Sequence, residues 1–211
     1  MRAMSFALSA ALLGACAGAP PPPDWQSNAH LALKNFETAY LRGDSGLGDS
    51  EFARARTELA STGRADLVAR AELARCAVQV ASLAIEDCPG FTALAADADA
   101  NERAYAEYIS GRWEGLNVDL LPAQHRPVVA SSALPTDPLA RLVAAGALLR
   151  AGRLEPAGIA AATEAASASG WRRPLLAWLG VQEKRAADSG DGEAAARIRR
   201  RIDLVMKGGN K

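Results

Sequence analysis

From residue 24 onward, apolar side chains recur every three or four positions, the spacing that places them on one face of a helix. In the first such segment, 24–42, Asp24 stands where an N-cap is needed, and Gly43 follows where a left-handed C-cap is needed. The apolar stripe of this segment consists of Trp25, Ala29, Ala32, Phe36 and Ala39. The pattern therefore predicts an amphipathic helix over 24–42.

The same spacing predicts helices along most of the remaining chain, with a loop over 44–49. The expected helices are 50–61, 65–85, 136–151, 155–169, 171–189 and 191–207, with 91–98 and 101–110 as two short helices or one bent helix. The stripe in 65–85 is wide, which favours a helix buried on more than one side. Glycine and proline separate the segments, and the predicted fold class is all-α.

Prolines and glycines interrupt the pattern between 112 and 135. This stretch is either a linker between two halves or a loop wrapped over the core. Long structureless loops are uncommon in compact domains, so we expect it to pack. The expected organisation is N-terminal helical hairpins over 24–111, an irregular connector over 112–135, C-terminal helical hairpins over 136–207 and a tail over 208–211.

Composition agrees with a helical fold and narrows the function. Aromatic residues make up 5% of the chain, whereas alanine and leucine are plentiful, as is typical of helices. The formal charge is zero, which gives no general basic excess for nucleic acid. After the N-terminal leader, no apolar run reaches the length that spans a bilayer.

The leader itself carries a short motif. A single early charge, Arg2, precedes an apolar run over 6–13, and Leu13-Gly14-Ala15-Cys16 follows. This arrangement resembles the signal of bacterial lipoproteins. The resemblance implies that 1–15 is a signal peptide and that Cys16 is acylated and becomes the mature N-terminus. The alternative is a plain secretory signal cut nearby, which leaves Cys16 as a stray thiol.

The resemblance also implies a location. Ala17 stands where lipoproteins retained in the inner membrane carry aspartate, so the resemblance favours a lipid anchor in the outer membrane, facing the periplasm. Four consecutive prolines in 16–23 favour an extended polyproline II spacer, because proline fixes φ and lacks an N–H group. We therefore expect 16–23 to be a tether between the bilayer and the folded part.

Two further cysteines, Cys76 and Cys88, remain. An even pair in an oxidising compartment favours a disulfide, and a chain that turns back at Pro89-Gly90 would bring the two together. Two buried thiols are the alternative. The spacing excludes a CxxC redox motif.

Two consecutive units, 138–170 and 171–207, follow one plan of helix, glycine turn and alanine-rich helix, and 24–63 follows it too. Segments 39–44 and 147–153 resemble the hairpins of tetratricopeptide repeats. The resemblance implies a short array of stacked hairpins with a groove that binds a partner peptide or protein. An irregular helical bundle remains the alternative.

Several strings mimic catalytic or metal-binding motifs. Residues 43–46 match the local sequence around a serine-protease nucleophile but are expected to cap a helix. Asp97, Asp99 and Asn101 mimic the start of a calcium loop whose glycine and final glutamate are missing. His30 is expected on a helix surface, and His125 lies in the irregular stretch. We therefore expect no enzyme, no metal site and no cofactor.

A basic cluster near the C-terminus has two interpretations. Arginines at the end of a helix that begins with acidic residues complement the helix dipole. Alternatively, Arg197, Arg199, Arg200 and Arg201 form a cationic face for an anionic partner, which Trp171-Arg172-Arg173 would extend.

Three functions follow from these observations. The first is a lipid-anchored, non-catalytic adaptor or assembly factor that binds an envelope protein. The second is an envelope-structure protein that binds cell wall or lipopolysaccharide through its basic helix. The third and weakest is an enzyme with dispersed carboxylates. Oligomeric state is not predicted.

Overall fold

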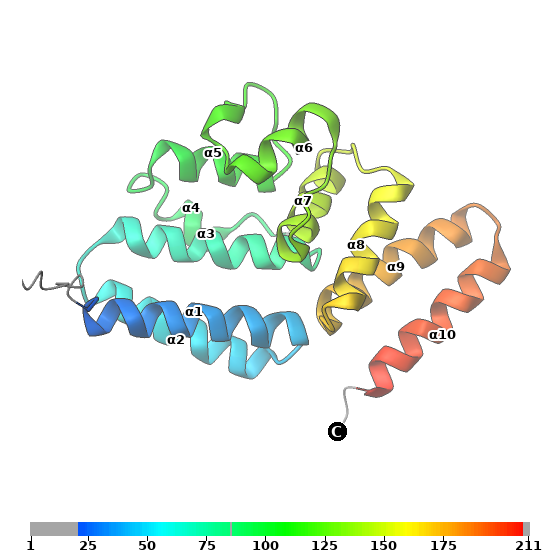
Figure 1. Ribbon diagram of the computed structural model, residues 1–211, viewed down its shortest axis with the longest axis horizontal. Coiled ribbons are helices and arrows are strands. Elements are labelled where there is room, and N and C mark those ends of the chain that lie inside the picture. Colours follow the sequence, from blue (N-terminus) through cyan, green and yellow to red (C-terminus); the bar gives the residue numbers. More distant parts are fainter. Residues whose placement is uncertain (1–20, 85, 209–211) are drawn as a thin grey trace, which may run out of the picture.

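The computed structural model describes residues 21–84 and 86–208, and these residues form an all-helical fold without strands (Figure 1). The predicted all-α class is confirmed. The α-helices are α1 (Asp24–Arg42), α2 (Ser45–Ala60), α3 (Ala65–Ala81), α4 (Pro89–Thr92), α5 (Ala100–Ile109), α6 (Arg126–Ser131), α7 (Pro138–Arg150), α8 (Pro156–Ala168), α9 (Arg172–Asp188) and α10 (Gly192–Gly208). Two short 3₁₀ helices, η1 (Val118–Leu120) and η2 (Ala123–His125), precede α6.

Helices α1 and α2 form the first hairpin. Gly43 closes α1 in the left-handed region at φ 93°, and the side chain of Asp44 accepts a hydrogen bond from the backbone N–H of Leu47 as the N-cap of α2. The predicted loop over 44–49 is therefore wrong, because α2 begins at Ser45. Gly48 faces the backbone of Tyr40, and a Cβ atom at this position would make an ordinary van der Waals contact with it, 3.5 Å from the Tyr40 nitrogen.

Helix α3 is the central element of the N-terminal part. Val68, Ala71 and Val78 pack into the core shared with α1 and α2, whereas Leu73 and Ala77 belong to a second core shared with α5 and α7. The prediction that this helix is buried on more than one side is confirmed. Its predicted end at residue 85 is wrong, because α3 ends at Ala81 and Leu83 adopts a φ of 58°. Residue 85 itself lies outside the described residues.

Helix α7 crosses α3 at close range. A Cβ atom at Gly146 would lie 2.5 Å from the carbonyl oxygen of Val80, so only glycine permits this approach. Eight of the thirteen residues of α7 are buried, among them Leu142, Val143 and Leu148. The second core therefore joins residues on both sides of the expected connector.

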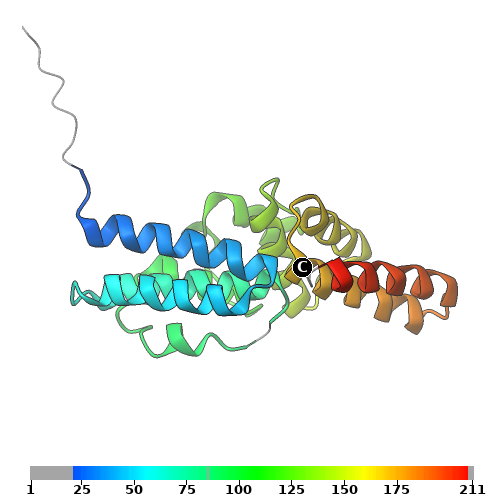
Figure 2. The same ribbon diagram turned by 90° about the horizontal axis from the view of Figure 1, so that it is seen from below.

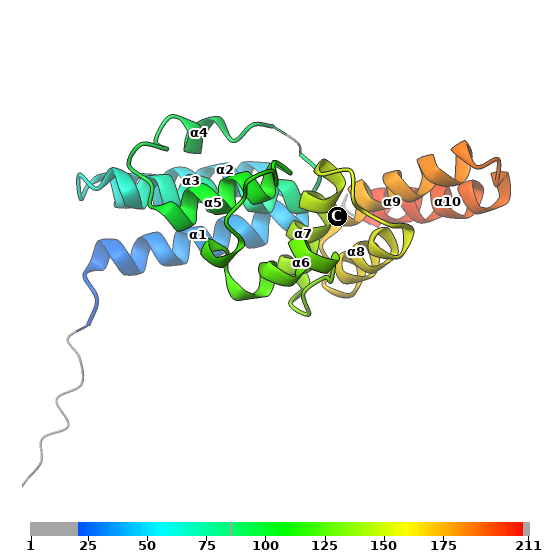
Figure 3. The same cartoon turned by 90° about the horizontal axis from the view of Figure 1, so that it is seen from above.

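The stretch expected to be irregular covers this core. Leu121, His125 and Val128 are all buried, and η1, η2 and α6 interrupt what would otherwise be a long loop. The expectation that it packs is confirmed. Helix α4 spans four residues and is shorter than the predicted 91–98, whereas α5 keeps the predicted length and starts at the capping box of Asp99 with Glu102. Helix α4 runs beside α3 along one edge of the molecule (Figure 3).

Helices α7 to α10 form two successive hairpins, and α9 and α10 project from the rest of the molecule (Figures 1 and 2). The N-terminal half of α9 returns to the earlier helices. The indole N–H of Trp178 donates to the carbonyl of Ala81 at 3.1 Å, and the Arg173 guanidinium donates to the carbonyl of Tyr40 at 2.7 Å. The C-terminal hairpins are thereby joined to α1 and α3.

Candidate functional site

A cavity of about 640 Å³ opens between α3, α5 and the segment around η1, and we call it the α3–α5 groove. Its lining includes the apolar side chains of Leu73, Leu120 and Leu121 and the ring of Tyr105. Ala74, a small exposed residue of α3, also lines it. Charged side chains at its edge come from Arg70, Asp99, Glu102, Asp119 and Arg126. An apolar lining with a charged edge is typical of sites that bind a protein segment.

One side of the groove is held by a polar network between α3 and α5. The Arg70 guanidinium donates to the Glu102 carboxylate at 2.6 Å and lies 3.8 Å from Asp99. Asp99 and Glu102 also exchange the hydrogen bonds of a capping box at the start of α5. The hydrogen bond that Arg70 donates to Glu102 raises the pKa of Arg70 above its ordinary value. This side of the groove is therefore charged but internally paired.

The other side leaves polar groups available. The Arg126 guanidinium donates to the carbonyl of Leu121 at 2.9 Å and, within the described residues, forms no ion pair. The Asp119 carboxylate is exposed, and within the same residues it also forms no ion pair. Tyr105 lines the cavity, and its hydroxyl has no hydrogen-bond partner in the part of the chain that the structure describes. A ligand in the groove can accept a hydrogen bond from Tyr105 and pair with Arg126.

Tyr105 belongs to a cluster of packed aromatic rings. The rings of Tyr105 and Tyr108 stack at 5.9 Å, Tyr108 stacks on Trp113 at 5.6 Å, and the ring of His125 lies 5.0 Å from Tyr108. Burial raises the pKa values of both tyrosines. The cluster supports the floor of the groove and fixes the ring plane of Tyr105.

The two histidines lie in different settings. His125 is 2% exposed, and its Nδ1 lies 3.2 Å from the Tyr108 hydroxyl. Burial lowers the pKa of His125 to about 4, against an opposing effect of Asp137, so the imidazole is neutral at pH 7. His125 is therefore a packing residue. His30 is exposed on α1, as predicted.

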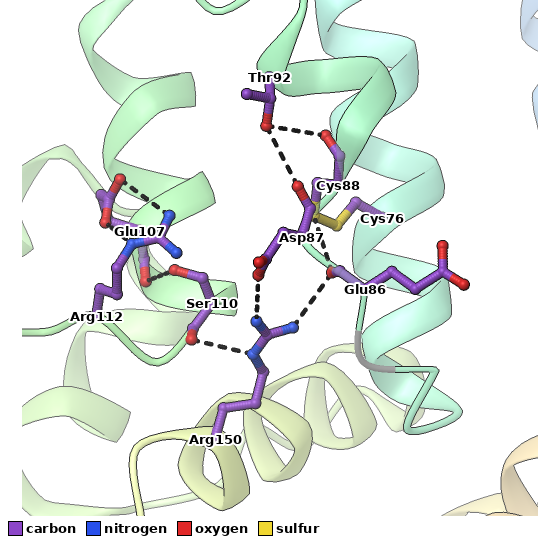
Figure 4. A network of polar contacts seen from close by, with 9 residues as sticks. All are labelled: Cys76, Glu86, Asp87, Cys88, Thr92, Glu107, Ser110, Arg112 and Arg150. Atoms are coloured by element: carbon purple, nitrogen blue, oxygen red, sulfur yellow. Dashed lines mark hydrogen bonds and ion pairs between the residues drawn. A yellow bond between two sulfur atoms is a disulfide. The ribbon is translucent and has the colours of Figure 1, made fainter.

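Cys76 on α3 and Cys88 before α4 lie at disulfide distance, with their Cα atoms 5.6 Å apart, which confirms the predicted pairing (Figure 4). The intervening turn is also held from α7. Arg150 donates to the carbonyls of Ser110 at 3.0 Å and Glu86 at 3.4 Å and to the Asp87 carboxylate at 3.1 Å.

Figure 4 shows how these contacts converge on 86–88. The Arg150 side chain is only 10% exposed, and the Thr92 hydroxyl lies 3.2 Å from the carbonyl oxygens of both Asp87 and Cys88. The turn is thus fixed by α3, α4 and α7 together. The cysteine spacing predicts the disulfide that ties the turn to α3, but it does not predict the role of Arg150.

The four arginines of the basic cluster do not share one environment. Arg197 pairs with Glu193 at 3.4 Å, and Arg199 turns toward α9 and pairs with Glu183 at 2.6 Å. Arg200 and Arg201 are exposed, and neither forms an ion pair within the described residues.

The expected extension through 171–173 is only partial. Arg172 reaches the Met206 carbonyl of α10 at 3.3 Å. Arg173 leaves the basic cluster, since its guanidinium lies over the Tyr40 ring at 4.2 Å from the centroid and donates to the Ser45 hydroxyl.

The strings that mimic catalytic motifs have structural roles. Ser45 begins α2 and receives a hydrogen bond from Arg173, with Asp44 as the cap before it. Asp99, from the calcium-like string, belongs to the capping box of α5. Among residues 21–84 and 86–208, no group of three or more histidine, cysteine or acidic side chains is placed to hold a metal ion.

The predicted signal peptide and the acylation site Cys16 lie outside the described residues. Pro21, Pro22 and Pro23 precede α1 in non-helical backbone. None of the described helices combines the length and apolar character needed to cross a bilayer.

Comparisons of the chain with protein-family models, with curated proteins and with solved structures gave no match.

Proposed function

We propose that this chain is a lipid-anchored adaptor of the bacterial envelope, facing the periplasm, which binds a segment of a partner protein in the α3–α5 groove. The observation that carries the proposal is a largely apolar lining that includes Tyr105, whose hydroxyl has no hydrogen-bond partner among the described residues. The anchor rests on the lipoprotein-like motif that ends at Cys16.

The chemistry of the groove favours a peptide or helix with one apolar anchor. The half-buried Leu120 and Tyr105 ring offer an apolar surface to such a side chain. The buried Leu73 and Leu121 lie at the base of the lining. The Tyr105 hydroxyl can donate to a backbone carbonyl, and Arg126 can pair with a carboxylate on the partner. Because the aromatic cluster is packed from behind, the floor is in place before the partner arrives, which reduces the cost of binding.

The experiment is crosslinking in cells with purification and mass spectrometry of the captured proteins. Ala74→Trp places a large ring in the groove from an exposed position of α3, and Ala53→Trp makes the same change on the exposed side of α2 as the matched control. We expect the partner to be captured by the wild type and by Ala53→Trp and to be lost with Ala74→Trp.

Two results would count against the proposal. Equal capture of the partner by both tryptophan variants would show that the groove does not bind it. Full capture by Cys16→Ser, with that variant released from membranes, would show that the anchor does not contribute to the adaptor role.

A further inference from the structure

The last helix, α10, has an outer face that no other described helix covers. It packs on α9 through the buried Ala195 and the half-buried Ile198, Ile202 and Val205. It lies at the end of the molecule opposite the first turn of α1 (Figures 1 and 2). The side of α10 that faces away from α9 is therefore open along its whole length.

Cationic side chains gather on this open side. At about 100° per residue, five exposed side chains fall within an arc of about 120° that also holds Glu193 and Gly208: they are Arg197, Arg200, Arg201, Leu204 and Lys207. Arg197 pairs with Glu193, whereas the other three cations form no ion pair within the described residues. We call these five residues the α10 stripe.

The stripe is not explained by the average charge of the chain. Helix α10 carries five lysine and arginine residues and two acidic residues, in a chain whose total formal charge is zero. Three of the cations lie within the same arc and form no ion pair with any described residue. Dipole complementation favours cations in the last turn of a helix, but Arg200 and Arg201 lie about two turns before its end.

An exposed leucine stands in the middle of the cations. Leu204 is 72% exposed. An exposed leucine among cations is the composition of a helix face that lies on a membrane surface. At a bilayer surface it enters the apolar boundary while its cationic neighbours meet the phosphates.

We propose that the α10 stripe is a contact site for the phosphate groups of an anionic lipid bilayer. Arg200, Arg201 and Lys207 pair with the phosphates, and Leu204 inserts between the headgroups. This sharpens the earlier alternative that the basic cluster binds cell wall or lipopolysaccharide, and it is independent of the α3–α5 groove. With a tether before α1, the molecule would be held to the membrane at both ends.

The test is co-sedimentation with vesicles at low salt. The full chain carrying Cys16→Ser is compared on vesicles of equal parts phosphatidylglycerol and phosphatidylcholine and on vesicles of phosphatidylcholine alone. All variants share the same leader, so any difference between them arises elsewhere. We expect stronger binding to the anionic vesicles, weakened as the salt concentration is raised.

Arg200→Glu with Arg201→Glu is the decisive variant. An arginine near an anionic surface contributes enough that losing two lowers the partition coefficient at least about 30-fold. Lys34→Glu with Arg185→Glu makes the same change in net charge at exposed positions of α1 and α9 and should lower it far less. Leu204→Ser should weaken binding to the anionic vesicles while leaving the salt dependence in place.

The glutamine pair, Arg200→Gln with Arg201→Gln, covers the case in which charge reversal disturbs α10, and circular dichroism checks its helicity. Three results would overturn the proposal. They are equal binding to the two kinds of vesicle, equal losses in the α10 variant and its charge-matched control, and sedimentation with isolated cell wall but not with anionic vesicles.

Discussion

The hairpins α7–α8 and α9–α10 follow one another with the same plan, yet the fold buries them very differently. Eight residues of α7 and five of α8 are buried, compared with three of α9 and one of α10. Helix α7 is covered by α3, α5 and α8, whereas α10 packs on α9. Burial in this molecule is decided by what lies against a helix rather than by the helix's own pattern.

Two glycines in the interiors of helices make the sharpest test of this comparison. Gly146→Val should lower the free energy of unfolding by about 3 kcal/mol, because the new side chain meets the Val80 backbone. Gly180 on α9 has nothing within 4 Å of a built Cβ, so Gly180→Ala should raise stability by about 0.5–1 kcal/mol. Urea unfolding measures both, and a similar change in the two variants would contradict the comparison.

Loss of the disulfide between Cys76 and Cys88 should lower the free energy of unfolding almost as much as Gly146→Val does. Joining residues separated by 12 positions restricts the unfolded chain, and loss of the bond should lower the free energy of unfolding by about 2–3 kcal/mol. The measurement is urea unfolding of oxidised and reduced protein in the Cys16→Ser background. Alkylation and intact mass confirm the redox state.

Hydrogen exchange shows which part of the molecule is loosened when the disulfide is reduced. Reduction should increase exchange around 86–92 and leave α9 and α10 unchanged. An increase confined to α10 would show that the turn is not held by the bond.

Acidic pH should lower the free energy of unfolding, because His125 in the core becomes protonated. Its pKa in the folded protein is about 4, below the ordinary value of 6.5, so the unfolded chain binds the proton more readily. This source of stability is intact above pH 6.5 and is lost as the pH falls toward 4, with about 2 kcal/mol lost at pH 5.

Comparison of the wild type with His125→Gln isolates this effect. The variant should show a shallower decline in the free energy of unfolding between pH 7 and pH 5. His30→Gln, at an exposed position, serves as the control and should follow the wild type.

The smallest effect is expected at the open end. Leu204→Ala removes a side chain that is 72% exposed and should change the free energy of unfolding by less than about 0.5 kcal/mol. Leu148→Ala, the same change at a position that is 1% exposed, should cost about 3 kcal/mol. Thermal or urea unfolding of the two proteins measures the difference directly.

Much of the helical content could be predicted, because periodicity records which face of each segment is apolar. The end of α1 follows directly from Gly43, and the cysteine pair follows from the turn at Pro89. The expected N-cap at Asp24 is wrong, because Asp24 is the first residue of the helix and Pro23 occupies the cap position. The start of α2 was missed because Gly46 and Gly48 look like loop residues. The end of α3 was missed because Leu83 continues the apolar pattern while its backbone leaves the helix.

The groove could not be predicted from the pattern. Its lining joins Leu73, Tyr105 and Leu121, which belong to three separate segments. Each reads in sequence as an ordinary core residue, and only the packing of α5 and η1 on α3 leaves them around an open space. Arg150 is similar, since nothing near it in the sequence indicates that it reaches Asp87.

The hydrogen bond from Trp178 to Ala81 has a consequence for the order in which the molecule is completed. The two residues are 97 positions apart, so the carbonyl at the end of α3 obtains its donor only when the C-terminal part of the chain has folded back. Contacts of such long range slow folding, because a large loop must close before they form. The centre of this fold is therefore completed by a helix from the C-terminal part of the chain.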